Sequence, residues 1–331
     1  MMKKTACSML LASSLLVPFG QSAFANIPLL TIDSGGGGAI VPWAYISNAP
    51  KKGGIGMPAA SIWTWVSDSY TINFWPVAVS IGDRLELGFA YQNLDISTLK
   101  SDLRGDSAAA LGANRLDTKL DNLQMITAHA KFQFVKESEN WPAMAISVSY
   151  KKALDVDELD DNLTANVRNA GLVAANGPKV MEWMGVDDDD GFEVNLMATK
   201  LWKTKIPILT AVNLRYTQAN QLGFLGFSDD WSLNPEFTLA ILPEPNVAIG
   251  IEYRKKPDEL KSVNDYLRAN TAVPGLGTLN DYTFGEDDFI DFFVAYLPTP
   301  NLTIAAGIAN IGNVVHRETK SIWAFNINYD F

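Results

Sequence analysis

The last eleven residues of the chain, SIWAFNINYDF at positions 321–331, alternate between apolar and mostly polar side chains. Counting back from Phe331, the residues Tyr329, Ile327, Phe325 and Trp323 form one apolar face. A two-residue period is typical of a β-strand whose two faces meet different surroundings. The apolar face of this strand must therefore lie against a protein core or against lipid.

The same period predicts twelve strands along the chain. They lie near 55–67, 70–81, 84–93, 123–135, 143–153, 191–202, 206–217, 235–243, 246–255, 288–298, 301–311 and 320–331. Most are about ten residues long, which is the length that crosses a bilayer at a tilt. The uncharged run 292–312 has the length of a membrane helix, but Pro298, Pro300 and Asn301 divide it into two strands. Pro76 lies inside a predicted strand and should force a β-bulge there.

The connections between these strands alternate in length, which indicates how the strands are arranged. Short turns are expected at 82–83, 136–142, 203–205, 243–245 and 298–300, and long segments at 94–122, 154–190, 218–234, 256–287 and 312–319. Only the first hairpin, at 67–70, breaks the pattern. Short and long connections in alternation predict an all-β fold, a transmembrane antiparallel up-and-down barrel in a Gram-negative outer membrane. An even strand number places both termini on the short-turn side, in the periplasm.

The N-terminal residues have the features of a secretory signal. Lys3 and Lys4 precede the apolar run 6–20, and the small residues of AFA at 23–25 mark a cleavage site, so residues 1–25 are expected to be removed. The mature chain then has no cysteine. Residues 26–54 are rich in glycine and lie outside the predicted wall, which spans 55–331, since a thirteenth strand at 39–47 would break the even number.

Many inward positions of the predicted barrel are small, which leaves room in its lumen. The segment 26–54 is therefore a candidate plug, and a disordered periplasmic tail is the alternative. The plug candidates are Gly35, Gly36, Gly37, Gly38, Pro42 and Trp43.

Charged residues on the polar faces of the strands should line the lumen. These lumen-lining candidates are Glu86, His129, Lys131, Lys151, Glu193, Arg215, Glu252, Arg254 and Asp291. Facing rows of opposite charge are typical of selective channels, because they orient a polar solute across a narrow opening. The same residues are equally consistent with a closed salt-bridge network inside a sealed barrel.

Catalytic and metal chemistry have weak support in the sequence. A lumen His129 has Lys131 two residues on, where twelve-stranded outer-membrane phospholipases have a serine, and His316 lacks a paired-aspartate motif. We therefore assign no catalytic residues and expect no enzyme and no cofactor. The acidic runs 155–161 and 187–190 do not match an EF-hand loop. Asp187, Asp188, Asp189 and Asp190 remain weak metal candidates, with a solvated loop as the alternative.

Composition and chain ends suggest which partners to expect. The formal net charge of −11 disfavours nucleic acid, whose phosphates would repel the chain. Outward aromatic residues near strand ends are expected in the interfacial girdles that contact outer-membrane lipids and lipopolysaccharide. The terminal Phe331, with Tyr329, resembles the signal read by the outer-membrane assembly machinery.

Four stretches carry a resemblance to a known family. They are GGGGAIVPWAYI (35–46), IGDRLELGFAYQ (81–92), GIEYRKKPDEL (250–260) and DFFVAYLPTPNLTIAAGIANIGNVV (291–315). The chain resembles an uncharacterised proteobacterial family of outer-membrane barrels, known only as a domain of unknown function, which supplies no activity and no catalytic residues. The sequence therefore favours a channel for passive or selective passage of small polar solutes. A sealed barrel that binds partners through its acidic outer loops is the alternative, and a lipid-acting enzyme is the least favoured.

Overall fold

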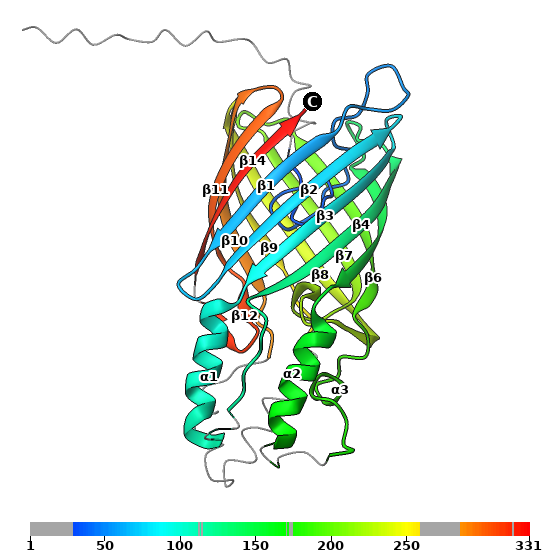
Figure 1. Ribbon diagram of the computed structural model, residues 1–331. Coiled ribbons are helices and arrows are strands. Elements are labelled where there is room, and N and C mark those ends of the chain that lie inside the picture. Colours follow the sequence, from blue (N-terminus) through cyan, green and yellow to red (C-terminus); the bar gives the residue numbers. More distant parts are fainter. Residues whose placement is uncertain are drawn as a thin grey trace, which may run out of the picture.

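The computed structural model describes residues 29–111, 113, 115–169, 171, 175–258, 285–319 and 321–331. Within them, twelve strands form a closed barrel, and each strand pairs antiparallel with its two neighbours (Figure 1). The barrel closes where β14 (Ile322–Asp330) pairs with β1 (Ala59–Val66). This confirms the predicted fold class. The expected signal peptide lies outside the described residues.

The other wall strands follow one another around the barrel in sequence order. They are β2 (Thr71–Ile81), β3 (Leu85–Asp95), β4 (Asn122–Val135), β5 (Ala143–Ala153), β6 (Asp190–Trp202), β7 (Ile208–Ala219), β8 (Phe227–Glu244), β9 (Val247–Arg254), β10 (Phe289–Thr299) and β11 (Leu302–Asn310). Except for the β1–β2 hairpin at 67–70, the short turns lie with the C-terminus at one end of the barrel, here called the short-turn end, and the longer connections extend from the other, the loop end (Figure 1).

Alternation sorts the side chains of every strand into two environments. On β3, Leu87 and Phe89 are exposed on the outer surface, whereas Glu86 and Ala90 are fully buried inside. On β14 and at the residue that follows it, Trp323, Phe325, Ile327, Tyr329 and Phe331 are all exposed, and the residues between them are buried. The outer surface of the barrel is thus apolar, as a lipid-facing barrel wall requires, which resolves the choice between core and lipid for the terminal strand.

The loop end is covered by structure that strand periodicity did not predict. It consists of α1 (Ser97–Leu111), α2 (Val156–Asn169), α3 (Val180–Trp183), the 3-10 turn η3 (Gln221–Gly223) and the hairpin of β12 (Gly312–Val314) and β13 (Arg317–Thr319), together called the cap (Figure 1). Leu99, Leu159 and Met181 of the cap belong to one buried apolar cluster with Trp65 and Phe74 of the barrel interior. None of the helices among the described residues is long and apolar enough to cross a membrane.

Two local predictions about the wall were wrong. Strand β8 begins at Phe227, eight residues before the predicted start at 235, because its first part still pairs with the end of β7, where Phe227 lies opposite Ala219 after a register shift. Pro76 causes no bulge: β2 keeps one register with β3 from Thr71 to Ile81. On the β1 side, pairing stops between Phe74 and Val77 and resumes without a shift. The missing N–H thus falls in an interruption of the ladder, and no residue needs to be inserted.

Candidate functional site

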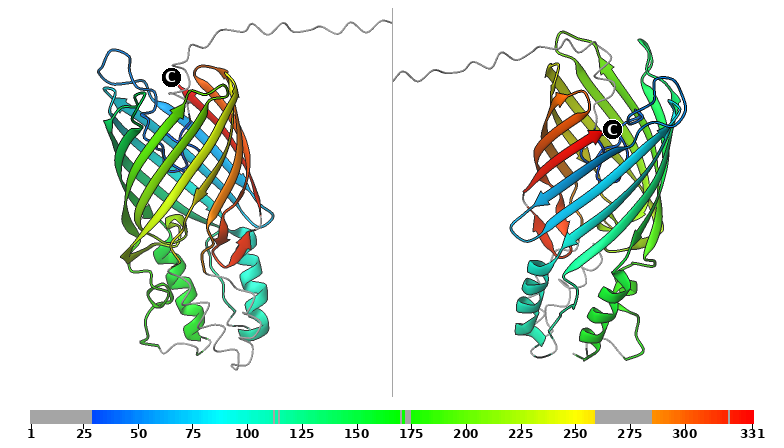
Figure 2. Two further views of the ribbon diagram at one scale, coloured as in Figure 1. Left: turned by 180° about the vertical axis from the view of Figure 1, so that it is seen from behind. Right: turned by 45° about the horizontal axis from the view of Figure 1, so that its top comes forward.

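The interior of the barrel is filled by residues 29–50, here called the lumen segment (Figure 2). The segment folds back on itself: Thr31 N donates to Gly35 O at 2.8 Å, Gly38 N to Val41 O at 3.0 Å and Trp43 N to Gly36 O at 3.0 Å. Residues 29–44 are buried, except Asp33 and Pro42, which are half-buried. Where the sequence left a plug and a disordered tail open, the structure places the predicted glycines, Pro42 and Trp43 inside the barrel.

Two carboxylates of the wall hold the backbone of the lumen segment. Glu86 on β3 accepts from Gly36 N at 3.1 Å and from the backbone N and hydroxyl of Ser47, both at 2.6 Å. Glu252 on β9 accepts from Ala39 N at 2.7 Å and Ile40 N at 2.9 Å. Gly38 allows this approach, because a Cβ there would lie 2.0 Å from Glu252 Oε1. Hydrogen bonds to a charged acceptor are about twice as strong as neutral ones, so these contacts anchor the segment.

Donors of the wall bind the carbonyl groups of the same segment. Lys131 Nζ donates to Gly36 O at 3.1 Å and to Trp43 O at 3.3 Å, and Gln133 Nε2 donates to Ala44 O at 2.8 Å. Because wall acids bind its amides and wall donors bind its carbonyls, the lumen segment is held by its backbone more than by its side chains.

Trp43 is the main apolar anchor of the lumen segment. Its side chain is only 3% exposed and lies in a cluster with Leu209, Leu242 and Phe293 of the barrel interior. Its indole nitrogen donates to Thr238 Oγ1 at 3.1 Å. Burial of an aromatic side chain with its polar atom satisfied contributes several kcal/mol, of the order of 3–5 lost on truncation to alanine.

Five charged residues on adjacent strands form a continuous line of ion pairs across the inner wall, here called the charge arc. They are Lys151 on β5, Glu193 on β6, Arg215 on β7, Glu236 on β8 and Arg254 on β9. Successive pairs lie 3.4, 3.4, 2.7 and 2.7 Å apart, and each side chain is at most 3% exposed. Three cations and two anions give the charge arc a formal charge of +1.

Asp33 of the lumen segment connects the two ends of the charge arc. Its carboxylate lies 3.0 Å from Lys151 Nζ and 3.5 Å from Arg254 Nη1, and accepts from Gln92 Nε2 at 3.3 Å. The formal charges of the charge arc and Asp33 together sum to zero. A cavity of about 20 Å³ lies beside this carboxylate, lined in part by Glu193, Lys131 and Arg254. That volume holds about one water molecule.

His129 lies between a hydroxyl and a carboxylate. Its Nδ1 is 2.8 Å from Ser34 Oγ, and its Nε2 is 3.1 Å from Glu86 Oε1. The order of groups resembles a hydrolytic triad. However, the Ser34 hydroxyl also lies 2.5 Å from the backbone oxygen of Asp33, and Ser34 is completely buried. The cavity beside His129 holds about one water molecule, so an acyl substrate does not fit beside the serine in this structure.

Asp291 lies in the barrel wall and is not part of the acidic run at 187–190. Asp291 is buried on β10 directly opposite Glu252 on β9. Three of the four aspartates at 187–190 have different side-chain partners: Asp187 Oδ2 accepts from the backbone N of Asp229, Asp189 pairs with Lys152 at 2.6 Å, and Asp190 accepts from the Tyr150 hydroxyl. No group of three His, Cys, Asp or Glu side chains gathers as a metal site within the described residues.

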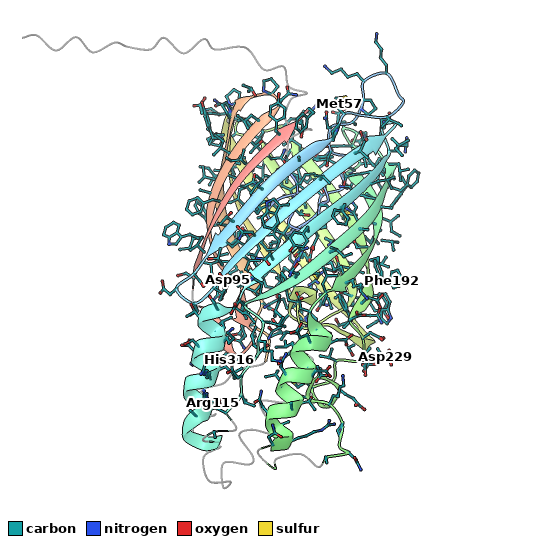
Figure 3. The ribbon with its side chains drawn as sticks, in the orientation of Figure 1. Met57, Asp95, Arg115, Phe192, Asp229 and His316 are labelled. Atoms are coloured by element: carbon teal, nitrogen blue, oxygen red, sulfur yellow. The ribbon has the colours of Figure 1, made fainter. Side chains whose placement is uncertain are left out.

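His316 lies in the β12–β13 hairpin of the cap, beyond the wall (Figure 3). Its side chain is almost completely buried. Burial, assisted by the neighbouring Arg317, lowers the pKa of His316 to about 3. The imidazole is therefore neutral at physiological pH. It is far along the barrel from His129, so the structure does not bring the two histidines together in one site.

The terminal residues complete the short-turn end of the wall. Phe331 N donates to Pro58 O at 3.0 Å, and the Phe331 ring packs edge-on against Tyr329 with centroids 5.0 Å apart. Asn48 of the lumen segment donates to Phe331 O at 3.3 Å. The lumen segment thus also contacts the strand that closes the barrel.

Sequence reasoning missed Glu236 of the charge arc and Asp33, which connects the two ends of the arc. Glu236 follows Pro235 on β8 and alternates with the exposed Phe237, so the strand period carried a signal that it faces inward. Asp33 had no such signal, because the lumen segment has no strand period. Its position became visible only when the fold placed it between Lys151 and Arg254.

The family model described as "Protein of unknown function (DUF3034)" matches residues 28–328 of the chain. The chain belongs to this family. No curated protein matches it. An apolar outer surface on a closed barrel defines the class of outer-membrane β-barrels, and the chain has this fold.

Solved outer-membrane barrels resemble the structure at low sequence identity. The KdgM porin in complex with disordered oligogalacturonate has 6% identity and a TM-score of 0.45, with 82% of this chain and 99% of that chain covered. The COG4313 outer membrane channel from Pseudomonas putida F1 has 10% identity and a TM-score of 0.43, with 88% and 100% covered. LpxR from Salmonella typhimurium has 10% identity and a TM-score of 0.42, with 82% and 100% covered. Likenesses at this level carry no statement about function.

Proposed function

We propose that the protein is an outer-membrane channel for small polar solutes and that its own lumen segment holds it closed. The observation that carries the proposal is the character of the inner wall. Buried ions are expensive, and apolar side chains of similar volume often stabilise a protein as well or better. The charge arc, Glu86 and Glu252 nevertheless line the space that the lumen segment fills. A wall of this kind is suited to contact polar solutes after the segment leaves.

The attachment of the lumen segment supports such a movement. Residues 51–55, which connect it to β1, are all exposed, and Gly53 and Gly54 have positive φ values of 73° and 87°. Glycine adopts such angles without strain and gives the linker many alternative conformations. Within the described residues, this linker joins the lumen segment to the wall, and the segment enters from the short-turn end (Figure 2). We place that end, with both termini, in the periplasm, as the direction of the strands in such barrels predicts.

A second function is favoured by a different observation. Apolar residues of the cap pack against the barrel interior, as Leu159 of α2 does in the same cluster as Ile40 and Val41 of the lumen segment. A barrel closed from both ends in this way suits a sealed protein that binds partners at its surface. Acidic side chains such as Asp157 and Glu158, in the first turn of α2, would then face those partners.

Swelling of proteoliposomes in an isotonic solution of arabinose separates the two functions. We compare the mature chain with a variant lacking residues 26–50, which retains the linker and every wall strand. The channel proposal expects slow swelling with the mature chain and fast swelling with the deletion variant. A deletion variant that is folded but does not swell the vesicles would instead support the sealed barrel. Heat-modifiable electrophoretic mobility checks that each protein is a folded barrel.

A further inference from the structure

The contact between Asp33 and the charge arc is more specific than closure of the barrel requires. A single carboxylate from the lumen segment lies between two cations on opposite ends of the arc, Lys151 and Arg254. Without this carboxylate, the two ends of the arc would lack their shared partner. The arc itself would keep a formal charge of +1.

Arg254 is incompletely satisfied by the groups around it. Among the residues that the structure describes, its Nε and Nη1 atoms make no hydrogen bond of good geometry. They nevertheless lie within ion-pair distance of Glu236 and Asp33. The Arg254 side chain is only 2% exposed. A guanidinium binds a carboxylate best through two parallel N–H groups, whereas Nη1 lies 3.5 Å from the Asp33 carboxylate and makes no hydrogen bond with it. A carboxylate that is free of the polypeptide can adopt the better geometry.

We propose that Lys151 and Arg254 form a binding site for the carboxylate of a small organic anion, and that Asp33 occupies this site as an internal mimic in the closed barrel. The inference rests on the proposed channel function, and it names the class of solute that the channel selects. Gln92 and the cavity beside Asp33 provide a further donor and space for water around the ligand. The lumen segment and the solute then compete for one site.

Binding of acetate to the variant lacking residues 26–50 tests the site without depending on conductance. The measurement is saturation-transfer NMR in detergent micelles, with acetamide as the uncharged probe of equal size. Acetate should bind this variant at least about tenfold more tightly than it binds the mature chain, because Asp33 no longer competes for the charged donors. Acetamide should not bind to either protein.

Two substitutions in the deletion variant locate the site. Lys151→Gln should weaken acetate binding about tenfold, because it removes one charge-assisted contact. Lys152→Gln is the matched control: this neighbouring lysine pairs with Asp189 on the outer side of the wall and should leave binding unchanged. Equal acetate binding by the deletion variant and its Lys151→Gln form would overturn the proposal, as would equal binding by the deletion variant and the mature chain.

Asp33→Ala in the mature chain keeps the proposal testable if the deletion variant does not fold. Alanine removes the anion that both cations share and frees the space of its carboxylate, so acetate should bind this protein more tightly than the wild type. Asp68→Ala, in an exposed turn, is the control that should not change binding. Unchanged acetate binding by Asp33→Ala would overturn the site. A barrel that binds acetate but passes no solute would refute the channel function and leave the carboxylate site standing.

Discussion

Trp43→Ala should release the lumen segment while the wall remains folded. The indole is 3% exposed and donates to Thr238. A buried tryptophan covers about 150–250 Å², and at about 25 cal/mol/Å² this area contributes roughly 4–6 kcal/mol. Since alanine keeps part of the contact, we expect a loss of about 4 kcal/mol, in line with measured truncations of buried aromatic residues. A loss of that size raises the population of the unseated segment about 1,000-fold.

Hydrogen–deuterium exchange of peptides from residues 29–50 measures this population. The amides of Gly38 and Trp43, which donate within the lumen segment, should lose protection in Trp43→Ala, while amides of β4 and β5 keep theirs. Trp141→Ala is the control, because this tryptophan lies in a short turn and is 65% exposed. Protection of residues 29–50 that is the same in Trp43→Ala and wild type would refute the idea that Trp43 anchors the segment.

Three further predictions concern the lumen segment, the cap and the chain end. Gly38→Ala should weaken protection of residues 29–50, because its Cβ would lie 2.0 Å from Glu252 Oε1, whereas Gly105→Ala, with open space around it, should not. Through His316, acidification to about pH 5 should destabilise the cap by about 2 kcal/mol, because the lowered pKa of His316 means that only the unfolded state gains a proton on this group below pH 6.5. Hydrogen exchange of residues 312–319 measures this loss of stability. The same acid response in His316→Gln as in the wild type would contradict the prediction. Deletion of Phe331 should reduce the yield of folded barrel in the outer membrane several-fold, measured by heat-modifiable mobility, and a normal yield would remove this residue from the assembly signal.

The contribution of His316 to the acid response of the cap is the difference between the wild type and His316→Gln, because a second buried group at the loop end also titrates. Glu286, also at the loop end, is buried beside Lys256, and burial raises the pKa of its carboxyl to about 7. A raised carboxyl pKa stabilises the folded state at low pH, which is opposite in sign to the effect of His316. The comparison with His316→Gln removes the contribution of Glu286, because that group is present in both proteins.

The wall was predictable from sequence because a barrel strand repeats every two residues and meets two contrasting environments. That period placed Glu86, His129 and Lys131 on one face, and these three side chains do lie together inside the barrel. The same reasoning would have found Glu236. It failed at Pro76 because the position of a proline in the hydrogen-bond ladder, not its presence in a strand, decides whether a bulge is needed.

The cap and the lumen segment were harder to predict for physical reasons. In sequence, α2 is dominated by an acidic run. Its apolar stripe consists of Val156, Leu159 and the partly buried Leu163, which is only two turns of helical spacing. The lumen segment has neither a helical nor a strand period, since its backbone is held by long-range contacts with Glu86 and Glu252. Contacts between residues far apart in the sequence, such as Ala39 and Glu252 at a separation of 213 positions, leave no local pattern. The position of Asp33 therefore required the structure.

The conductance of single barrels in planar bilayers tests the central claim most directly. The mature chain and the variant lacking residues 26–50 are compared under identical salt and voltage, after both are shown to be folded. Closure by the lumen segment predicts that the mature chain is mostly silent and that the deletion variant gives stable, ohmic current steps. Absence of current from the folded deletion variant at every voltage, or equal current from both proteins, would contradict the claim that this segment closes a channel.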